Sequence, residues 1–99
     1  MGQMTNNTRA HVFLTGRVQG VAYRFFAEKY ARSLGVTGWV RNRGDGRVEV
    51  LAEGDRASVD RFLGRLKEGP RLARVEDVDV RWEAYTGEFP DFRVSFSYD

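Results

Sequence analysis

A glycine-punctuated loop followed by an arginine is the segment of this sequence best suited to chemistry. Gly16 and Gly20 flank a short stretch between an expected strand and the first turn of an expected helix. Such a loop can aim successive backbone N–H groups into one concavity, and the helix N-terminus adds a positive dipole. Arg24 falls in that first turn, where a guanidinium can donate two parallel hydrogen bonds. The segment predicts a phosphate or carboxylate site, although the residues alone leave open a tight turn with a solvated arginine.

Asn42 is a second candidate, because it ends the next expected strand. In a split β-α-β unit the first two strands are parallel with a third between them, so their ends emerge at one sheet edge about 10 Å apart. Arg24 and Asn42 could then address one ligand, while ordinary turn chemistry remains the alternative for an asparagine here. The Gly-Lys-Ser/Thr ending of a Walker loop is missing, which argues against a nucleoside triphosphate.

The remaining polar residues offer little chemistry of their own. The chain has no cysteine and a single histidine, His11, which excludes thiolate chemistry and a His-rich metal cluster. The acidic residues around Asp77 and Asp79 are interpreted as one polar strand face. We therefore expect no metal and no cofactor. Lys and Arg number 16 against 14 Asp and Glu, a net charge of +2 that by itself names no partner.

Hydrophobic periodicity predicts two helices and five strands. Residues 23–34 have apolar side chains at helical spacing before Gly35, and a second helix opens at Asp55 and stops at Gly69-Pro70. Strands are expected at 11–15, 36–42, 47–52, 78–84 and, briefly, in the alternating tail 92–98.

The order β-α-β-β-α-β with a short terminal strand predicts a ferredoxin-like α+β sandwich, an antiparallel sheet with two helices on one face. Residues 1–8 are expected to be a disordered tail and residues 9–99 a single domain. This fold hosts binders, enzymes and RNA readers alike, so it does not decide function.

Two stretches of the sequence together resemble a known family. Gly-Arg-Val-Gln-Gly-Val-Ala-Tyr-Arg at 16–24 and Gly-Trp-Val-Arg-Asn at 38–42, followed by Gly-Arg-Val-Glu at 46–49 and Gly54, are similar to the two signature stretches of acylphosphatases. The resemblance covers about residues 9–98, including the order of elements, and shows no departure at the positions expected to do chemistry.

The resemblance implies hydrolysis of an acyl phosphate to a carboxylate and inorganic phosphate without metal or cofactor. It implies that Arg24 is the essential cation and that Asn42 positions the attacking water. The phosphate would be held by the backbone loop, here Gly16, Arg17, Val18, Gln19, Gly20, Val21, Ala22 and Tyr23.

This chemistry suits the residues present. The leaving carboxylate has a conjugate acid of pKa about 4, so it departs without a general acid. Phosphoryl transfer needs mostly positioning and electrostatic stabilisation of a loose transition state. The water's proton can pass to a phosphate oxygen of the substrate.

Three other functions were weighed against this one. A non-catalytic phosphate- or anion-binding module is the main alternative. An RNA-binding sheet would expose stacking aromatics on its central strands, and residues 47–52 have none. The chain length favours a separate domain over part of a larger maturation factor. The expected partner is thus a small-molecule acyl phosphate, with no nucleic acid and no membrane, for a cytoplasmic monomer.

Overall fold

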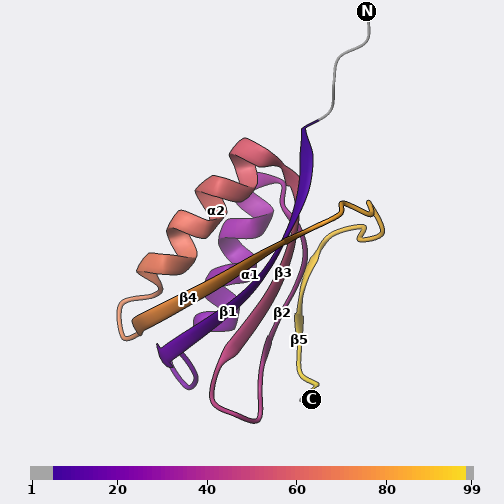
Figure 1. Ribbon diagram of the computed structural model, residues 1–99. Helices are drawn as coiled ribbons and strands as arrows, with labels where there is room; N and C mark the ends of the chain where they lie inside the picture. Colours follow the sequence, from indigo (N-terminus) through magenta and orange to yellow (C-terminus); the bar gives the residue numbers. More distant parts are fainter. Residues whose placement is uncertain (1–5, 98–99) are drawn as a thin grey trace, which may run out of the picture.

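Apolar residues at alternate positions of three neighbouring strands determine which face of the sheet is buried. The computed structural model describes residues 6–97, in which Val12, Val40 and Val50 pack beneath two helices that cover one face (Figure 1). The elements are β1 (Asn7–Arg17), α1 (Tyr23–Leu34), β2 (Thr37–Asn42), β3 (Val48–Asp55), α2 (Arg56–Glu68), β4 (Arg74–Glu83) and β5 (Phe92–Ser95).

The order of strands across the sheet is β4-β1-β3-β2-β5. Since β3 pairs antiparallel with both β1 and β2, these two strands run in the same direction on either side of it, as predicted. The ferredoxin-like α+β fold is therefore confirmed, with both helices on one face.

The sequence pattern leaves the place of the last strand in the sheet open, and the structure decides it. β4 is antiparallel to β1, and the chain reverses once in residues 84–91 before β5, so β5 pairs parallel with β2. Such parallel pairing needs a connection long enough to cross the sheet, which this segment supplies. The sheet is mixed, and β5 ends beside the strand that carries Asn42 (Figure 1).

The helix bounds agree closely with the sequence pattern. α1 spans the predicted residues, with Gly35 as its C-cap in a left-handed conformation. α2 begins after Asp55, whose carboxylate accepts a hydrogen bond from the Ser58 amide. The C-cap of α2 is Gly69, as the Gly-Pro signal predicted.

The strands extend further than the sequence pattern indicates, and this corrects the expected tail. Asn7 and Thr8, expected to be disordered, belong to β1 and pair with Asp55 and Gly54. The reason is that β3 runs on to Asp55 and offers β1 a longer partner. Of the other residues of the expected tail, only Asn6 is described, and residues 1–5 lie outside the described residues.

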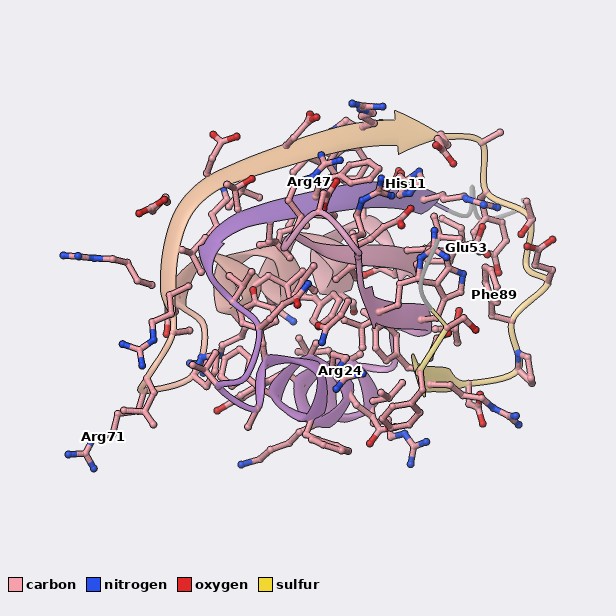
Figure 2. All side chains as sticks on the ribbon, turned by 90° about the horizontal axis from the view of Figure 1, so that it is seen from below. His11, Arg24, Arg47, Glu53, Arg71 and Phe89 are labelled. Atoms are coloured by element: carbon pink, nitrogen blue, oxygen red, sulfur yellow. The ribbon has the colours of Figure 1, made fainter. Side chains whose placement is uncertain are left out.

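The sheet face away from the helices is closed by charged side chains. Glu49 is buried there and receives hydrogen bonds from Arg41 at 2.8 Å and Arg43 at 3.1 Å, with His11 Nε2 at 2.5 Å. Glu53, 0% exposed, accepts from the amides of Thr86 and Gly87 in the segment that leads to β5 (Figure 2). These contacts hold that segment, and with it β5, against the sheet.

Candidate active site

The loop between β1 and α1 is anchored by two valines. Val18 and Val21 are buried in the core, so the backbone between them is held at the surface. Gly20 has φ +73° and Ala22 has φ +60°, both in the left-handed region. For an alanine this conformation costs about 1 kcal/mol or more, and such strain gathers at functional sites. The strained turn leads directly into the first residue of α1.

The amides of this loop are available to a ligand. In the part of the chain that the structure describes, no hydrogen bond joins the backbone N–H groups of residues 18–22 to an acceptor. Ala22 is the N-cap of α1 and provides no side-chain cap, so the positive end of the helix dipole is not neutralised. Consecutive free amides at a helix N-terminus form a concavity suited to an anion.

Gln19 joins this loop to the turn between β2 and β3. Its Nε2 donates to the carbonyl oxygens of Arg43 and Arg47, each at 2.8 Å. Asn42 ends β2 immediately before that turn. One side chain therefore fixes the amide loop relative to the strand end that carries Asn42.

The side chain of Asn42 lies on the helix-facing side of β2, in phase with Val40. It is only 7% exposed, and its Oδ1 has no hydrogen-bond partner among residues 6–97. A buried polar atom without a partner costs about 1–3 kcal/mol. An asparagine kept at that cost in a small core points to a role in binding or catalysis rather than in stability.

Arg24 and Asn42 line the same pocket, as the sequence predicted. The pocket has a volume of about 170 Å³, and Arg24 stands at the beginning of α1 (Figure 2). Arg24 makes no ion pair with a carboxylate within the described range, and its guanidinium carbon lies 4.9 Å from the centroid of the Phe96 ring. The pocket thus combines an unpaired cation, an unsatisfied amide oxygen and part of the amide loop.

The pocket includes some of the expected phosphate-binding residues and omits others. Val18, Gly20, Ala22 and Tyr23 line it, whereas Gly16, Arg17, Gln19 and Val21 do not.

Gly16, one of the omitted residues, lies at a bulge where β1 passes close to β4, and a Cβ there would stand 2.2 Å from the Arg74 carbonyl oxygen. It is needed for that close approach. Arg17 is exposed at the end of β1, where it lies opposite Arg74 in the register of β1 and β4.

Two aromatic residues near the pocket were not predicted from the sequence. Phe25 lines the pocket and is 57% exposed, and Phe96 contacts Arg24 and is 65% exposed. The helical periodicity of residues 23–34 could have revealed Phe25, because a phenylalanine beside Arg24 on the polar face is out of phase with the core. No local signal could have revealed Phe96, whose neighbour is distant in sequence.

Tyr23 connects the site to the second helix. Its hydroxyl donates to the Leu66 carbonyl oxygen near the end of α2. Burial raises the pKa of Tyr23, so the phenol stays protonated and acts as a donor rather than as a base. The side chain therefore holds the beginning of α1, where Arg24 lies, against α2.

A further feature of the described residues is the placement of side chains that could bind a metal ion. Between Asn6 and Ser97 the structure contains no group of three or more His, Asp or Glu side chains that could hold a metal ion. His11, the one histidine, contacts Glu49 and Glu83 on the sheet face away from the helices. Among these same residues no helix has the length and apolar character needed to cross a membrane.

The fold and the site define a class: a ferredoxin-like domain with a pocket at the start of its first helix that is lined by loop residues, an arginine and an asparagine. The acylphosphatase family model matches residues 10–94. An acylphosphatase of Roseiflexus sp. is 54% identical over 91 residues, covering 92% of this chain and 98% of the relative. One of Methylococcus capsulatus is 58% identical over 86 residues, covering 87% and 94%.

A solved structure agrees with these relatives. The acylphosphatase of Coxiella burnetii superposes with a TM-score of 0.86 at 40% identity, covering 91% of this chain and 94% of that one. The chain belongs to the acylphosphatase family. It is accordingly a hydrolase of the acylphosphatase type, and its family implies a small-molecule substrate.

Proposed function

We propose that this protein hydrolyses the carboxyl–phosphate bond of acyl phosphates without a metal ion, with Arg24 and Asn42 as its catalytic residues. The observation that carries the proposal is the Oδ1 of Asn42, which has no hydrogen-bond partner among the described residues. It is buried in the same pocket as the guanidinium of Arg24, for which these residues offer no ion pair. A cation and a hydrogen-bond acceptor in one pocket suit an anionic electrophile and the water that attacks it.

The phosphoryl group is bound by the amide loop and Arg24. The free N–H groups of residues 18–22 and the N-terminus of α1 neutralise its charge, and the guanidinium donates to two of its oxygens. These donors stabilise the charge of a loose transition state. Each well-placed donor contributes about 3 kcal/mol to lowering the barrier, by analogy with oxyanion-hole donors.

Asn42 orients the nucleophile. Its Oδ1 accepts a hydrogen bond from a water molecule and directs the water oxygen at phosphorus. The new P–O bond forms as the bond from phosphorus to the carboxyl oxygen breaks, and the carboxylate leaves with the electron pair. The water's proton passes to a phosphate oxygen, so no protein base is required. The leaving carboxylate is weakly basic, with a conjugate-acid pKa of about 4, and needs no general acid.

The deciding experiment measures release of phosphate from benzoyl phosphate and acetyl phosphate, with and without a chelator. Wild type should turn over both and keep its rate with the chelator. Arg24→Ala and Asn42→Ala should each lose about 100-fold or more in kcat while remaining folded by circular dichroism. Arg71→Ala removes an arginine that projects away from the molecule, and it should retain the wild-type rate (Figure 2).

Each contrary outcome has a definite meaning. Full activity of Asn42→Ala would remove the water-positioning role, and loss of activity on chelation would remove metal independence. A protein that binds phosphate but turns over neither substrate would be an anion-binding module. The expectations of a cytoplasmic monomer without a nucleic-acid partner stay predictions.

A further inference from the structure

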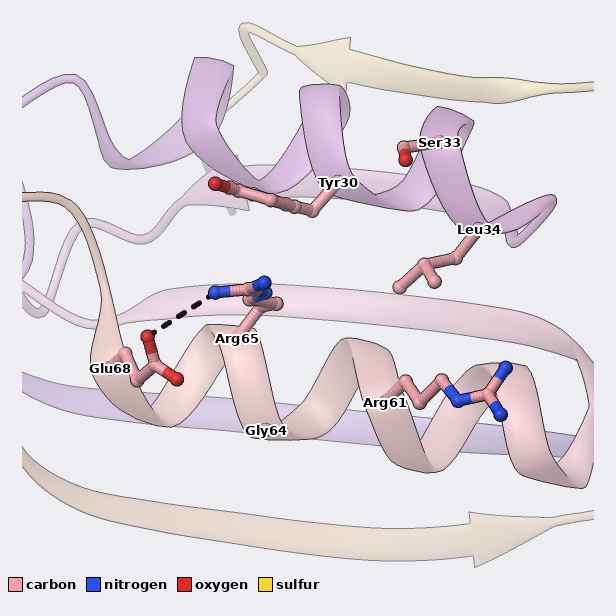
Figure 3. A pocket seen from close by; sticks show the side chains of 7 residues that line it. All are labelled: Tyr30, Ser33, Leu34, Arg61, Gly64, Arg65 and Glu68. Atoms are coloured by element: carbon pink, nitrogen blue, oxygen red, sulfur yellow. Dashed lines mark ion pairs between the residues drawn. The ribbon is translucent and has the colours of Figure 1, made fainter.

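A second hollow lies between α1 and α2 and shares no lining residue with the catalytic pocket. Its volume is about 300 Å³, larger than that of the catalytic pocket. α2 contributes residues at positions 61, 64, 65 and 68, a spacing that places them on one exposed face of the helix, and α1 contributes Tyr30, Ser33 and Leu34 (Figure 3). Neither the fold nor the proposed reaction explains this hollow.

The hollow has a positive rim. Arg61 has no ion pair with a carboxylate in the part of the molecule described, and Arg65 pairs only with the exposed Glu68, at 3.6 Å. Arg61 and Arg65 lie one helical turn apart, where two like charges repel each other. Figure 3 shows Arg65 turned toward Tyr30 and Glu68, whereas Arg61 extends along α2 in the opposite direction, on the side of Leu34. Arg61 is therefore the cation that an anion at this end of the hollow would meet.

The walls of the hollow are largely apolar. The Arg65 guanidinium carbon lies 4.8 Å from the centroid of the Tyr30 ring, and that ring is packed in turn against Phe26 at 4.8 Å. Leu34 closes the opposite end of the α1 wall (Figure 3). The stacked tyrosine restricts the motion of Arg65, so a charged group and a flat apolar surface stand side by side.

Gly64 borders the hollow without a side chain. It lies in the interior of α2, where glycine is less favourable than alanine. A Cβ at this position would meet no atom within 4 Å, so close packing does not require the glycine.

We propose that this hollow binds a small organic monoanion, a carboxylate on a flat apolar body. The carboxylate pairs with Arg61, and the flat body rests between Leu34 and Tyr30. Glu68 competes for Arg65, which limits affinity and disfavours ligands of higher negative charge. The site is independent of the proposed reaction, since it shares no residue with the catalytic pocket.

The test is a titration of the uniformly ¹⁵N-labelled protein with benzoate, followed by NMR. We expect saturable shifts of the Ser33, Gly64 and Arg65 amides. The Gly20 amide reports separately on the catalytic pocket, so the two sites are distinguished residue by residue. Benzyl alcohol lacks the charge and inorganic phosphate lacks the apolar body, and each should bind here at least about 5-fold more weakly than benzoate.

Three variants complete the experiment. Arg61→Ala should weaken benzoate binding at α2 by about 5-fold or more, whereas the control Arg71→Ala should leave it unchanged. Glu68→Gln should strengthen benzoate binding, with acyl phosphate hydrolysis and the folded spectrum retained.

Three results would overturn the proposal. These are benzoate shifts confined to the catalytic loop, equal binding of inorganic phosphate at α2, and unchanged benzoate binding by Arg61→Ala. Failure of acyl phosphate hydrolysis would not bear on it, because the titration does not depend on turnover.

Discussion

The guanidinium carbon of Arg24 lies 4.9 Å from the ring centroid of Phe96, although 72 positions separate the two residues in the chain. Arg24 lies in the first turn of α1, and Phe96 directly follows β5. The contact depends on the parallel pairing of β5 with β2, which brings the end of β5 to the pocket that Arg24 and Asn42 line. The last strand thereby restricts the orientation of the proposed catalytic cation.

Phe96→Ala should raise the KM for acyl phosphates by about 2- to 5-fold, because an exposed cation–π contact is worth about 0.5–1 kcal/mol. The guanidinium then samples more orientations and is less often placed to bind phosphate. Steady-state kinetics measure the change, and Phe96→Tyr should restore the wild-type KM. Leu72→Ala, at another exposed apolar residue, serves as the control. An unchanged KM in Phe96→Ala would show that the ring does not position Arg24.

Asn42→Ala should separate activity from stability. Its Oδ1 has no partner to lose within residues 6–97, so the free energy of unfolding should change by less than about 1 kcal/mol. The value of kcat should fall by about 100-fold or more. Urea unfolding and kinetics on the same sample test both statements. A loss of several kcal/mol in stability would instead assign Asn42 to the structural core.

Gln19→Ala should loosen the amide loop. The variant loses two hydrogen bonds to the turn after Asn42, each worth about 1 kcal/mol. We expect kcat/KM to fall by about 10-fold, with weaker inhibition by inorganic phosphate. Thr37→Val removes a hydrogen bond to the Glu53 carbonyl oxygen at the far end of β2 and should leave kinetics unchanged. Equal effects of both variants would mean that Gln19 acts only through general stability.

Glu49 should contribute a defined part of the acid dependence of stability. Burial raises the pKa of Glu49, but hydrogen bonds from His11, Arg41 and Arg43 outweigh burial and lower it below its ordinary value. Because the pKa is lower in the folded state, the stabilisation is fully present above about pH 4.5. It is lost as the pH falls through the lowered pKa.

Glu49→Gln tests this assignment. The variant should be less stable than wild type near neutral pH and should lose less further stability on acidification. Urea unfolding between about pH 3 and pH 7 provides the comparison. If the free energy of unfolding fell equally with decreasing pH in both proteins, another carboxylate would be responsible for the loss of stability in acid.

Glu53→Ala should release the segment that leads to β5. The buried carboxylate accepts hydrogen bonds from the amides of Thr86 and Gly87, both at 2.9 Å, and lies 3.5 Å from Arg9. Removing it should cost about 3 kcal/mol of stability. Hydrogen exchange of the Thr86 and Gly87 amides should accelerate more than that of α1 amides. Uniform acceleration would contradict a local clamp.

The parts of the fold and site that could be predicted are those encoded by neighbours in sequence. Helical periodicity and Gly35 located α1, and the glycines at 16 and 20 located the loop that precedes it. The expected split β-α-β unit brought Arg24 and Asn42 into one pocket. The sequence could not show which loop residues line the pocket and which, such as Gln19, lie outside it. Their positions depend on contacts with other elements, here the carbonyl oxygens of Arg43 and Arg47.

The sequence by itself determined the order of elements and the place of the glycine loop, because helix caps, turns and periodicity depend on residues only a few positions apart. The proposed roles of Arg24 and Asn42 come from the resemblance of their motifs to the acylphosphatase signatures. Only the tertiary structure decided that β5 pairs parallel with β2, that Phe96 contacts Arg24 and that Asn42 Oδ1 is left without a described partner. These relationships arise when distant segments pack, and no local pattern encodes which polar atom the packing leaves unsatisfied.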